Sequence, residues 1–151
     1  MPGQEEFLSA YKAGIIKELF ISTADDNYIA ARWCQQKNLL VDFYWLIVHA
    51  TEKYLKASLL YNEKPTLSYG HRIEKLYEAV EEYAGDLLPE YIECSEKINK
   101  DSVFGKEKTI DFIRRIYKWG NPNNRYKLYG YSQHPGDIYK ADEIIFAIRR
   151  L

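Results

Sequence analysis

Hydrophobic residues are densest in one stretch of the chain, from about Leu40 to Tyr61. Within it, two adjacent stripes recur at helical spacing, made of Phe43, Ile47, Ala50, Tyr54, Ala57 and Tyr61 and of Tyr44, Val48, Thr51, Leu55 and Ser58. Trp45 and Leu46 add apolar surface on the remaining side, so the first half of the segment is hydrophobic almost all round. This pattern predicts a long helix buried among several others.

Shorter amphipathic segments predict further helices on both sides of the long one. The spacing favours helices over about residues 5–20, 23–37 and 106–119, one that begins near Ser68 and ends at Gly85, one that begins near Pro89, and a last one capped by Asp137. Ser22 and Asp25 match a helix start signal, which separates the first helix from the second. No segment shows the sustained alternation of a half-buried strand. We therefore expect an all-α, antiparallel helical bundle.

A row of polar residues interrupts the long helix. Asp42, His49, Lys53 and Lys56 follow one another at spacings that place them on one side of it. This polar ridge fits a ligand cleft or a partner contact. It also fits a solvated helix edge, because lysine side chains extend their charged ends into water.

Composition limits the classes of function. The chain has 151 residues, 46% of them hydrophobic and 28% charged, with a formal net charge of −1, so a nucleic-acid contact would need a local basic patch. Cys34 and Cys94 lack metal or disulfide spacing and favour a reducing compartment. The N-terminus does not look like a signal peptide, and no apolar run is long enough to cross a bilayer. We expect a cytoplasmic protein without membrane contact.

The long helix also carries a family-like motif. The stretch His49-Ala-Thr-Glu-Lys-Tyr-Leu-Lys-Ala57 resembles the signature of HEPN domains, helical nucleotide-binding domains of higher eukaryotes and prokaryotes. Their Ala-x-Glu-Lys-x-x-Lys-Ala core is matched by Ala50, Glu52, Lys53, Lys56 and Ala57, although members often carry Gln in place of His49. Three further stretches resemble the family: residues 24–31, residues 70–76, and the pair Arg125-Tyr126.

The resemblance implies a single up-and-down helical domain over residues 1–151. Its family-like core spans about residues 23–150, and residues 1–22 form an N-terminal helical extension. It further implies a homodimer, and pairing with a minimal nucleotidyltransferase in toxin–antitoxin-like or defence systems. The polar ridge would then border the dimer contact or a ligand cleft shared with Arg125.

The segment before the last helix contains candidate site residues. The planar guanidinium group of arginine can bind phosphate, tyrosine rings can stack on bases, and histidine can transfer a proton near neutral pH. The candidate residues of these kinds are Arg125, Tyr126, Lys127, Tyr129, Tyr131 and His134. HEPN ribonucleases carry Arg, four to six residues, then His, whereas eight residues separate Arg125 from His134. The alternative is an ordered aromatic loop in which Arg125 anchors a helix end.

Two functions follow as hypotheses. The first is a non-catalytic HEPN-like module that binds a nucleotide, RNA or a partner protein through Arg125, Tyr126, Lys127, Tyr129 and the ridge residues His49, Lys53 and Lys56. The second is a metal-independent ribonuclease toxin that uses Arg125 and His134. Phosphate-binding glycine loops and metal motifs are missing from the sequence, so we expect no metal and no cofactor. The arginine pairs at 114–115 and 149–150 are interpreted as solvated.

Overall fold

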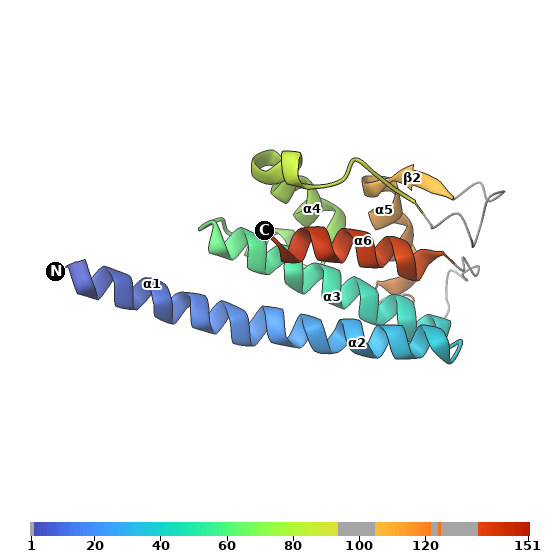
Figure 1. Ribbon diagram of the computed structural model, residues 1–151, viewed down its shortest axis with the longest axis horizontal. Coiled ribbons are helices and arrows are strands. Elements are labelled where there is room, and N and C mark those ends of the chain that lie inside the picture. Colours follow the sequence, from blue (N-terminus) through green and yellow to red (C-terminus); the bar gives the residue numbers. More distant parts are fainter. Residues whose placement is uncertain (1, 94–104, 122–123, 125–135) are drawn as a thin grey trace.

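The computed structural model describes residues 2–93, 105–121, 124 and 136–151. The described chain is predominantly helical, which confirms the all-α class (Figure 1). In chain order, the elements are α1 (Pro2–Ile16), a π-helical segment (Lys17–Ile21), α2 (Ser22–Gln36), α3 (Leu40–Tyr61), α4 (Ile73–Ala84), β1 (Tyr91–Glu93), β2 (Lys106–Lys108), α5 (Thr109–Gly120) and α6 (Asp137–Arg149). Short 3₁₀ turns cover Leu67–Tyr69 and Gly85–Leu87.

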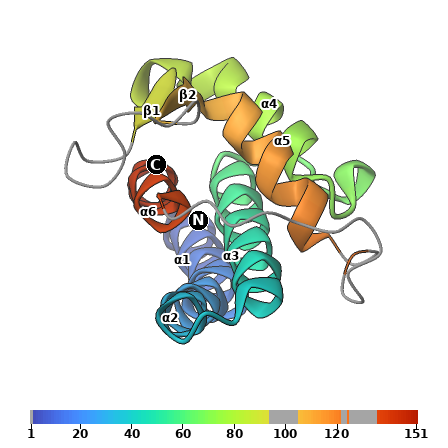
Figure 2. The same cartoon turned by 90° about the vertical axis from the view of Figure 1, so that its right-hand side faces the viewer.

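Helix α3 lies at the centre of the bundle, with the predicted bounds. It packs against α2, α4, α5 and α6, which surround it when the molecule is viewed end on (Figure 2). Ile47, Ala50, Leu55 and Ala57 are fully buried. The prediction of a helix buried among several partners is therefore confirmed, because an apolar surface on several sides needs neighbours on several sides.

One helix runs from α1 into α2 without a break, contrary to the predicted boundary at Ser22. Ser22 has helical dihedrals (φ −60°, ψ −42°), and its N–H donates to the carbonyl of Lys17 through the π-helical turn. The neighbouring Thr23 hydroxyl bonds back to the Leu19 carbonyl at 2.8 Å instead of capping a new helix. Asp25 was expected at a helix start, but it contacts Arg149 and Tyr54 from inside α2.

A two-stranded antiparallel ribbon stands where a helix was predicted after Pro89. Ile92 of β1 pairs with Glu107 of β2, and the Thr109 N–H donates to the Glu90 carbonyl at 2.9 Å. Leu88 and Ile92 are buried, as the helical interpretation also required. A helix and a strand both place residues four positions apart on the same side, so the burial of Leu88 and Ile92 fits either structure. The pairing with β2 is what makes Tyr91–Glu93 a strand. Helix α5 accordingly begins at Thr109, not at Lys106.

Three other helix ends differ from their predictions. Ser68 lies in a 3₁₀ turn, and α4 begins at Ile73 after Gly70, whose φ of +57° suits glycine. Gly85 is right-handed helical (φ −54°) and begins another 3₁₀ turn, so it is not a left-handed cap. Gly136 occupies the cap position of α6, and Asp137 is the first residue of that helix.

Helix α5 approaches α3 very closely at its last residue. A Cβ on Gly120 would lie 2.2 Å from the Tyr44 carbonyl oxygen and 2.5 Å from Val48 Cγ2. Glycine is therefore required at this crossing for packing.

Helix α1 extends past the end of the bundle, so the N-terminus lies far from the other elements (Figure 1). Two polar contacts join it to the end of α3 and the turn that follows: the Tyr61 hydroxyl donates to the Ala13 carbonyl at 3.4 Å, and Lys12 Nζ lies 4.0 Å from Glu63 Oε1. Ile16 is the first buried hydrophobic side chain among the described residues.

Candidate functional site

Two residues of the polar ridge of α3 are held by contacts, Lys53 to a neighbouring helix and His49 within α3 itself. Lys53 Nζ donates to Asn27 Oδ1 of α2 at 2.7 Å. His49 Nδ1 lies 2.8 Å from the Trp45 carbonyl, and its ring packs on the indole at a centroid distance of 4.3 Å. Asp42, at the start of the helix, is exposed.

A carboxylate connects the far end of the ridge to the turn before α4. Glu52 is only 8% exposed, and its Oε1 lies 2.7 Å from Lys56 Nζ and 3.0 Å from His71 Nδ1. His71 itself is largely exposed. Burial of a carboxylate is costly unless it is paired, so Lys56 and His71 compensate Glu52. Lys53 and Lys56 thus have structural partners, and each could reach a ligand only by exchanging them.

The other predicted site residues, Arg125, Tyr126, Lys127, Tyr129, Tyr131 and His134, lie outside the described residues, as does Cys94. Their chain neighbours are described on both sides. Asn124 is 1% exposed and its Nδ2 donates to the Trp119 carbonyl at 3.0 Å, while Asp137 is 2% exposed. Tyr44 contacts both flanking regions: its ring packs on Trp119, and its hydroxyl donates to Asp137 at 2.7 Å.

A buried ionic network lies at that end of the bundle. Arg115 of α5 bonds both oxygens of Asp137 at 2.7 Å and also contacts Glu107 of β2, to which Lys140 Nζ donates at 2.8 Å. Lys140 is 1% exposed. The prediction that Arg115 is solvated is therefore wrong: it faces α6, whereas Arg114, one position earlier, lies on the exposed side with Glu74.

The charges in this network stabilise one another. Burial acts to raise the pKa of Glu107, but hydrogen bonds from Arg115 and Lys140 outweigh it and lower that pKa. Burial likewise acts to lower the pKa of Arg115, and the bonds to Asp137 and Glu107 raise it instead. These groups remain charged near neutral pH, which suits a structural network better than a proton-transfer site.

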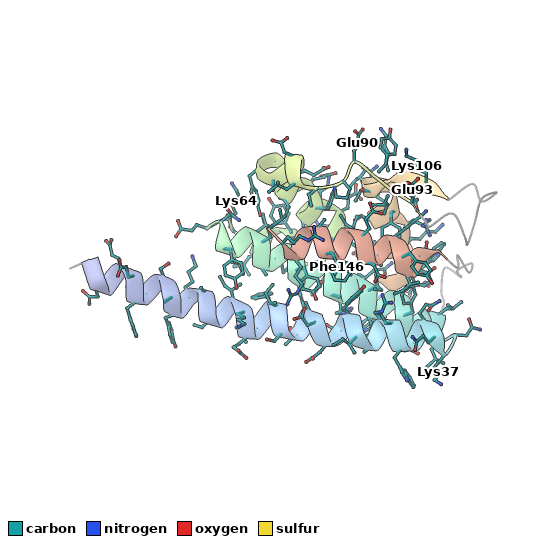
Figure 3. All side chains as sticks on the ribbon, viewed as in Figure 1. Lys37, Lys64, Glu90, Glu93, Lys106 and Phe146 are labelled. Atoms are coloured by element: carbon teal, nitrogen blue, oxygen red, sulfur yellow. The ribbon has the colours of Figure 1, made fainter. Side chains whose placement is uncertain are left out.

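A shallow apolar groove lies between α2 and α6. It holds about 230 Å³ and is lined by Asp25, Tyr28, Ile29, Tyr54, Ile145, Phe146 and Arg149. Phe146, labelled in Figure 3, packs edge-on against Tyr28 at a centroid distance of 6.2 Å. Arg149 Nε donates to Asp25 Oδ1 at 3.0 Å and lowers the pKa of that carboxyl, so Arg149 joins two helices and is not simply solvated.

The projecting part of α1 carries a row of exposed hydrophobic side chains. Five large hydrophobic side chains recur along α1 and the π-helical segment, with exposed fractions of 41–68%: Phe7, Leu8, Tyr11, Ile15 and Leu19. A hollow of about 580 Å³ opens beside Gly14, lined by Ala10, Tyr11, Gly14, Ile15, Lys17, Glu18 and Leu19. Figure 3 shows side chains extending from the lower side of α1, where no other element lies beside them. We call this surface the α1 face.

The sequence had indicated the helix but not the exposure of its apolar side. Helical spacing shows that hydrophobic residues share a face, and such a face is normally turned inward. Isolated exposed hydrophobic residues are ordinary, whereas a continuous row on a projecting helix marks an interaction site.

The chain matches no family model, no curated protein and no solved structure. The HEPN resemblance thus stays a prediction. Within the described ranges, no helix is both long and apolar enough to span a membrane, and no cluster of His, Cys, Asp and Glu side chains could hold a metal ion.

Proposed function

We propose that this protein is a HEPN-like helical module that works by binding other molecules and does not catalyse a reaction. The observation that carries the proposal is the α1 face, a row of exposed hydrophobic side chains on a helix that projects from the bundle. A surface of this kind suits a protein partner, because burying apolar area drives association.

The resemblance of residues 49–57 to the HEPN signature supports the family and its partners: a homodimer and a minimal nucleotidyltransferase-type protein. The same resemblance supports binding of a nucleotide or RNA. The proposed contacting residues are His49, Lys53 and Lys56 on α3, together with Arg125, Tyr126, Lys127 and Tyr129. The ion-pair network around Arg115 joins Arg115 and Lys140 to Asp137 and Glu107, which suits a structural role better than proton transfer.

The competing function is a metal-independent ribonuclease that uses Arg125 and His134. One observation favours it: both chain ends that flank these residues are buried and joined through Tyr44. The two described flanks of the segment that carries Arg125 and His134 therefore lie close to the same side chain, Tyr44.

An RNA degradation assay separates the two. The purified protein, incubated with single-stranded RNA and with chelator, is expected to leave the RNA intact. Degradation that disappears in both Arg125→Ala and His134→Ala would establish the ribonuclease and contradict the binding proposal. Lys106→Ala, an exposed position on β2, is the control for a nonspecific loss of charge.

A further inference from the structure

We propose that His71 is a covalent modification site, whose Nε2 accepts a phosphoryl group from a donor of the phosphoramidate class. Glu52 orients the imidazole ring, and Lys56 supplies positive charge beside it. The inference is separate from the proposed function, because each chain accepts one group without turnover. Neither the α1 face nor Arg125 takes part in it.

His71 lies in the turn before α4 and presents one edge of its ring to solvent. Its side chain is 70% exposed, and its Nδ1 lies 3.0 Å and 3.2 Å from the two oxygens of Glu52. An ionised carboxylate only accepts hydrogen bonds, so the proton of a neutral His71 ring is on Nδ1. The lone pair is then on Nε2, on the side of the ring opposite Glu52.

Glu52 is a rigid partner for this ring, because it extends from the central helix α3 and is only 8% exposed. Lys56 Nζ donates to its Oε1 at 2.7 Å, so the carboxylate keeps an ion pair whether or not His71 is charged. The contact with His71 therefore fixes the tautomer and the orientation of an exposed imidazole. A carboxylate plays the same part beside metal-bound and catalytic histidines.

His49 shows that this arrangement is specific to His71. The Nδ1 of His49 lies 2.8 Å from the carbonyl oxygen of Trp45, which is neutral, and its ring packs on the indole of the same residue. Of the two histidines within the described ranges, only His71 has a carboxylate partner. Glu52 is thus placed to stabilise positive charge that develops on the ring of His71 during a reaction at Nε2.

The charge beside the ring favours an anionic reagent. Lys56 Nζ and His71 Nδ1 contact the same oxygen of Glu52, so the ammonium group lies beside the imidazole. Phosphoryl transfer needs little more than an aligned nucleophile and positive charge near the phosphoryl oxygens. His71 and Lys56 supply these two elements, so a phosphoryl group is the substrate class that the cluster fits.

The reaction exchanges one P–N bond for another. The lone pair of His71 Nε2 attacks phosphorus, and the new bond forms as the bond between phosphorus and the nitrogen of the donor breaks. The donor nitrogen leaves as an amine with the protons it already carries. The imidazole gains one positive charge, and its Nδ1–H remains bonded to Glu52. No electron is transferred, and no further reactant is required.

Phosphorylation of the full chain by potassium phosphoramidate tests the inference, with N-acetylhistidine as the reference compound. We expect intact-mass spectrometry to show His71 modified at least about 10-fold faster than the reference, the size of effect typical of a partner that orients a reactive histidine. Phosphorus and nitrogen NMR should place the group on Nε2. The rapid reaction should be absent in His71→Asn.

A glutamine at position 52 then tests the role of the carboxylate as a positioning group. Glu52→Gln keeps the shape of the side chain and removes its charge, so the rate should fall about 10-fold or more, towards that of N-acetylhistidine. The matched control is Glu82→Gln, at an exposed position of α4, which should react as wild type. Far-UV circular dichroism checks that both variants fold.

Three results would each overturn the inference: a wild-type rate equal to that of N-acetylhistidine, attachment of the group at Nδ1, or a folded Glu52→Gln that reacts as fast as wild type. The first two need only the wild-type chain, so they decide the matter even if Glu52→Gln does not fold. The RNA degradation assay tests the proposed function independently of all three.

Discussion

Arg115 and Asp137 form a bidentate ion pair inside the bundle, with Nη1 and Nη2 each 2.7 Å from a carboxylate oxygen. The pair joins α5 to the first residue of α6, where a carboxylate is also favoured by the positive end of the helix dipole. It therefore fixes where α6 begins.

The Arg115 pair is expected to be important for stability. Arg115→Met leaves Asp137 and Glu107 buried without their main cation, and we expect a loss of about 3 kcal/mol in the free energy of unfolding. Urea denaturation followed by circular dichroism measures it. Arg114→Met, at the adjacent exposed position, should hardly change the urea midpoint. Equal midpoints for the two variants would contradict the structural role of Arg115.

The close crossing of α5 and α3 makes Gly120 sensitive to substitution. Gly120→Ala should destabilise the protein by about 1–3 kcal/mol, since the new methyl group overlaps the Tyr44 carbonyl and forces the helices apart. This loss exceeds the gain of up to about 1 kcal/mol from the better helix propensity of alanine. Gly85→Ala is the control, because its Cβ would meet nothing within 4 Å, and it should be neutral or stabilising. A thermal melt of the two variants distinguishes these outcomes.

The lowered pKa of Glu107 predicts a specific dependence of stability on acid. A carboxyl whose pKa is lower in the folded state stabilises the protein above its unfolded value of about 4.3, and this contribution is lost as the pH falls through the folded pKa. Glu107→Gln should therefore be less stable than wild type at pH 7 and should lose less stability between pH 5 and pH 3. Urea midpoints measured across that range test it.

Glu81 provides a control, because its pKa is shifted in the opposite direction from that of Glu107. Partial desolvation raises its pKa, with the charge of Glu78 adding to the effect, so the ionised form of Glu81 disfavours folding as the pH rises through the folded pKa. Glu81→Gln should consequently be no less stable than wild type at pH 7. The assignment of the acid dependence to Glu107 fails if both glutamine variants follow the wild-type profile.

The polar ridge yields a prediction about RNA binding. If Lys53 and Lys56 contact phosphates, Lys53→Ala with Lys56→Ala should lower the slope of log affinity against log salt by about 1.4 for single-stranded RNA. Fluorescence anisotropy of a labelled oligonucleotide measures that slope. Lys106→Ala with Lys108→Ala removes the same charge from β2 and should leave the slope unchanged. If the ridge variant dimerises and binds RNA like wild type, the ridge is only the solvated edge of α3.

The spacing of hydrophobic residues was enough to predict the helices that bury one continuous face. The bounds of α3 agree with the prediction because its apolar stripes are dense and because Pro65 follows closely. Short elements were harder to predict from the sequence. Tyr91–Glu93 pairs with Lys106–Lys108, and a strand of three residues has no period long enough to reveal itself in the sequence.

The sequence by itself determined a helical chain, a central buried helix and an N-terminal helix with an apolar side. It could not tell whether that apolar side is covered, because periodicity shows which residues share a face and not what packs against it. Nor could it separate Arg115 from Arg114, since adjacent helix positions point in different directions and only the placement of α6 gives one of them Asp137. Tertiary structure decided those points, since burial and ion pairing depend on contacts between segments distant in the chain.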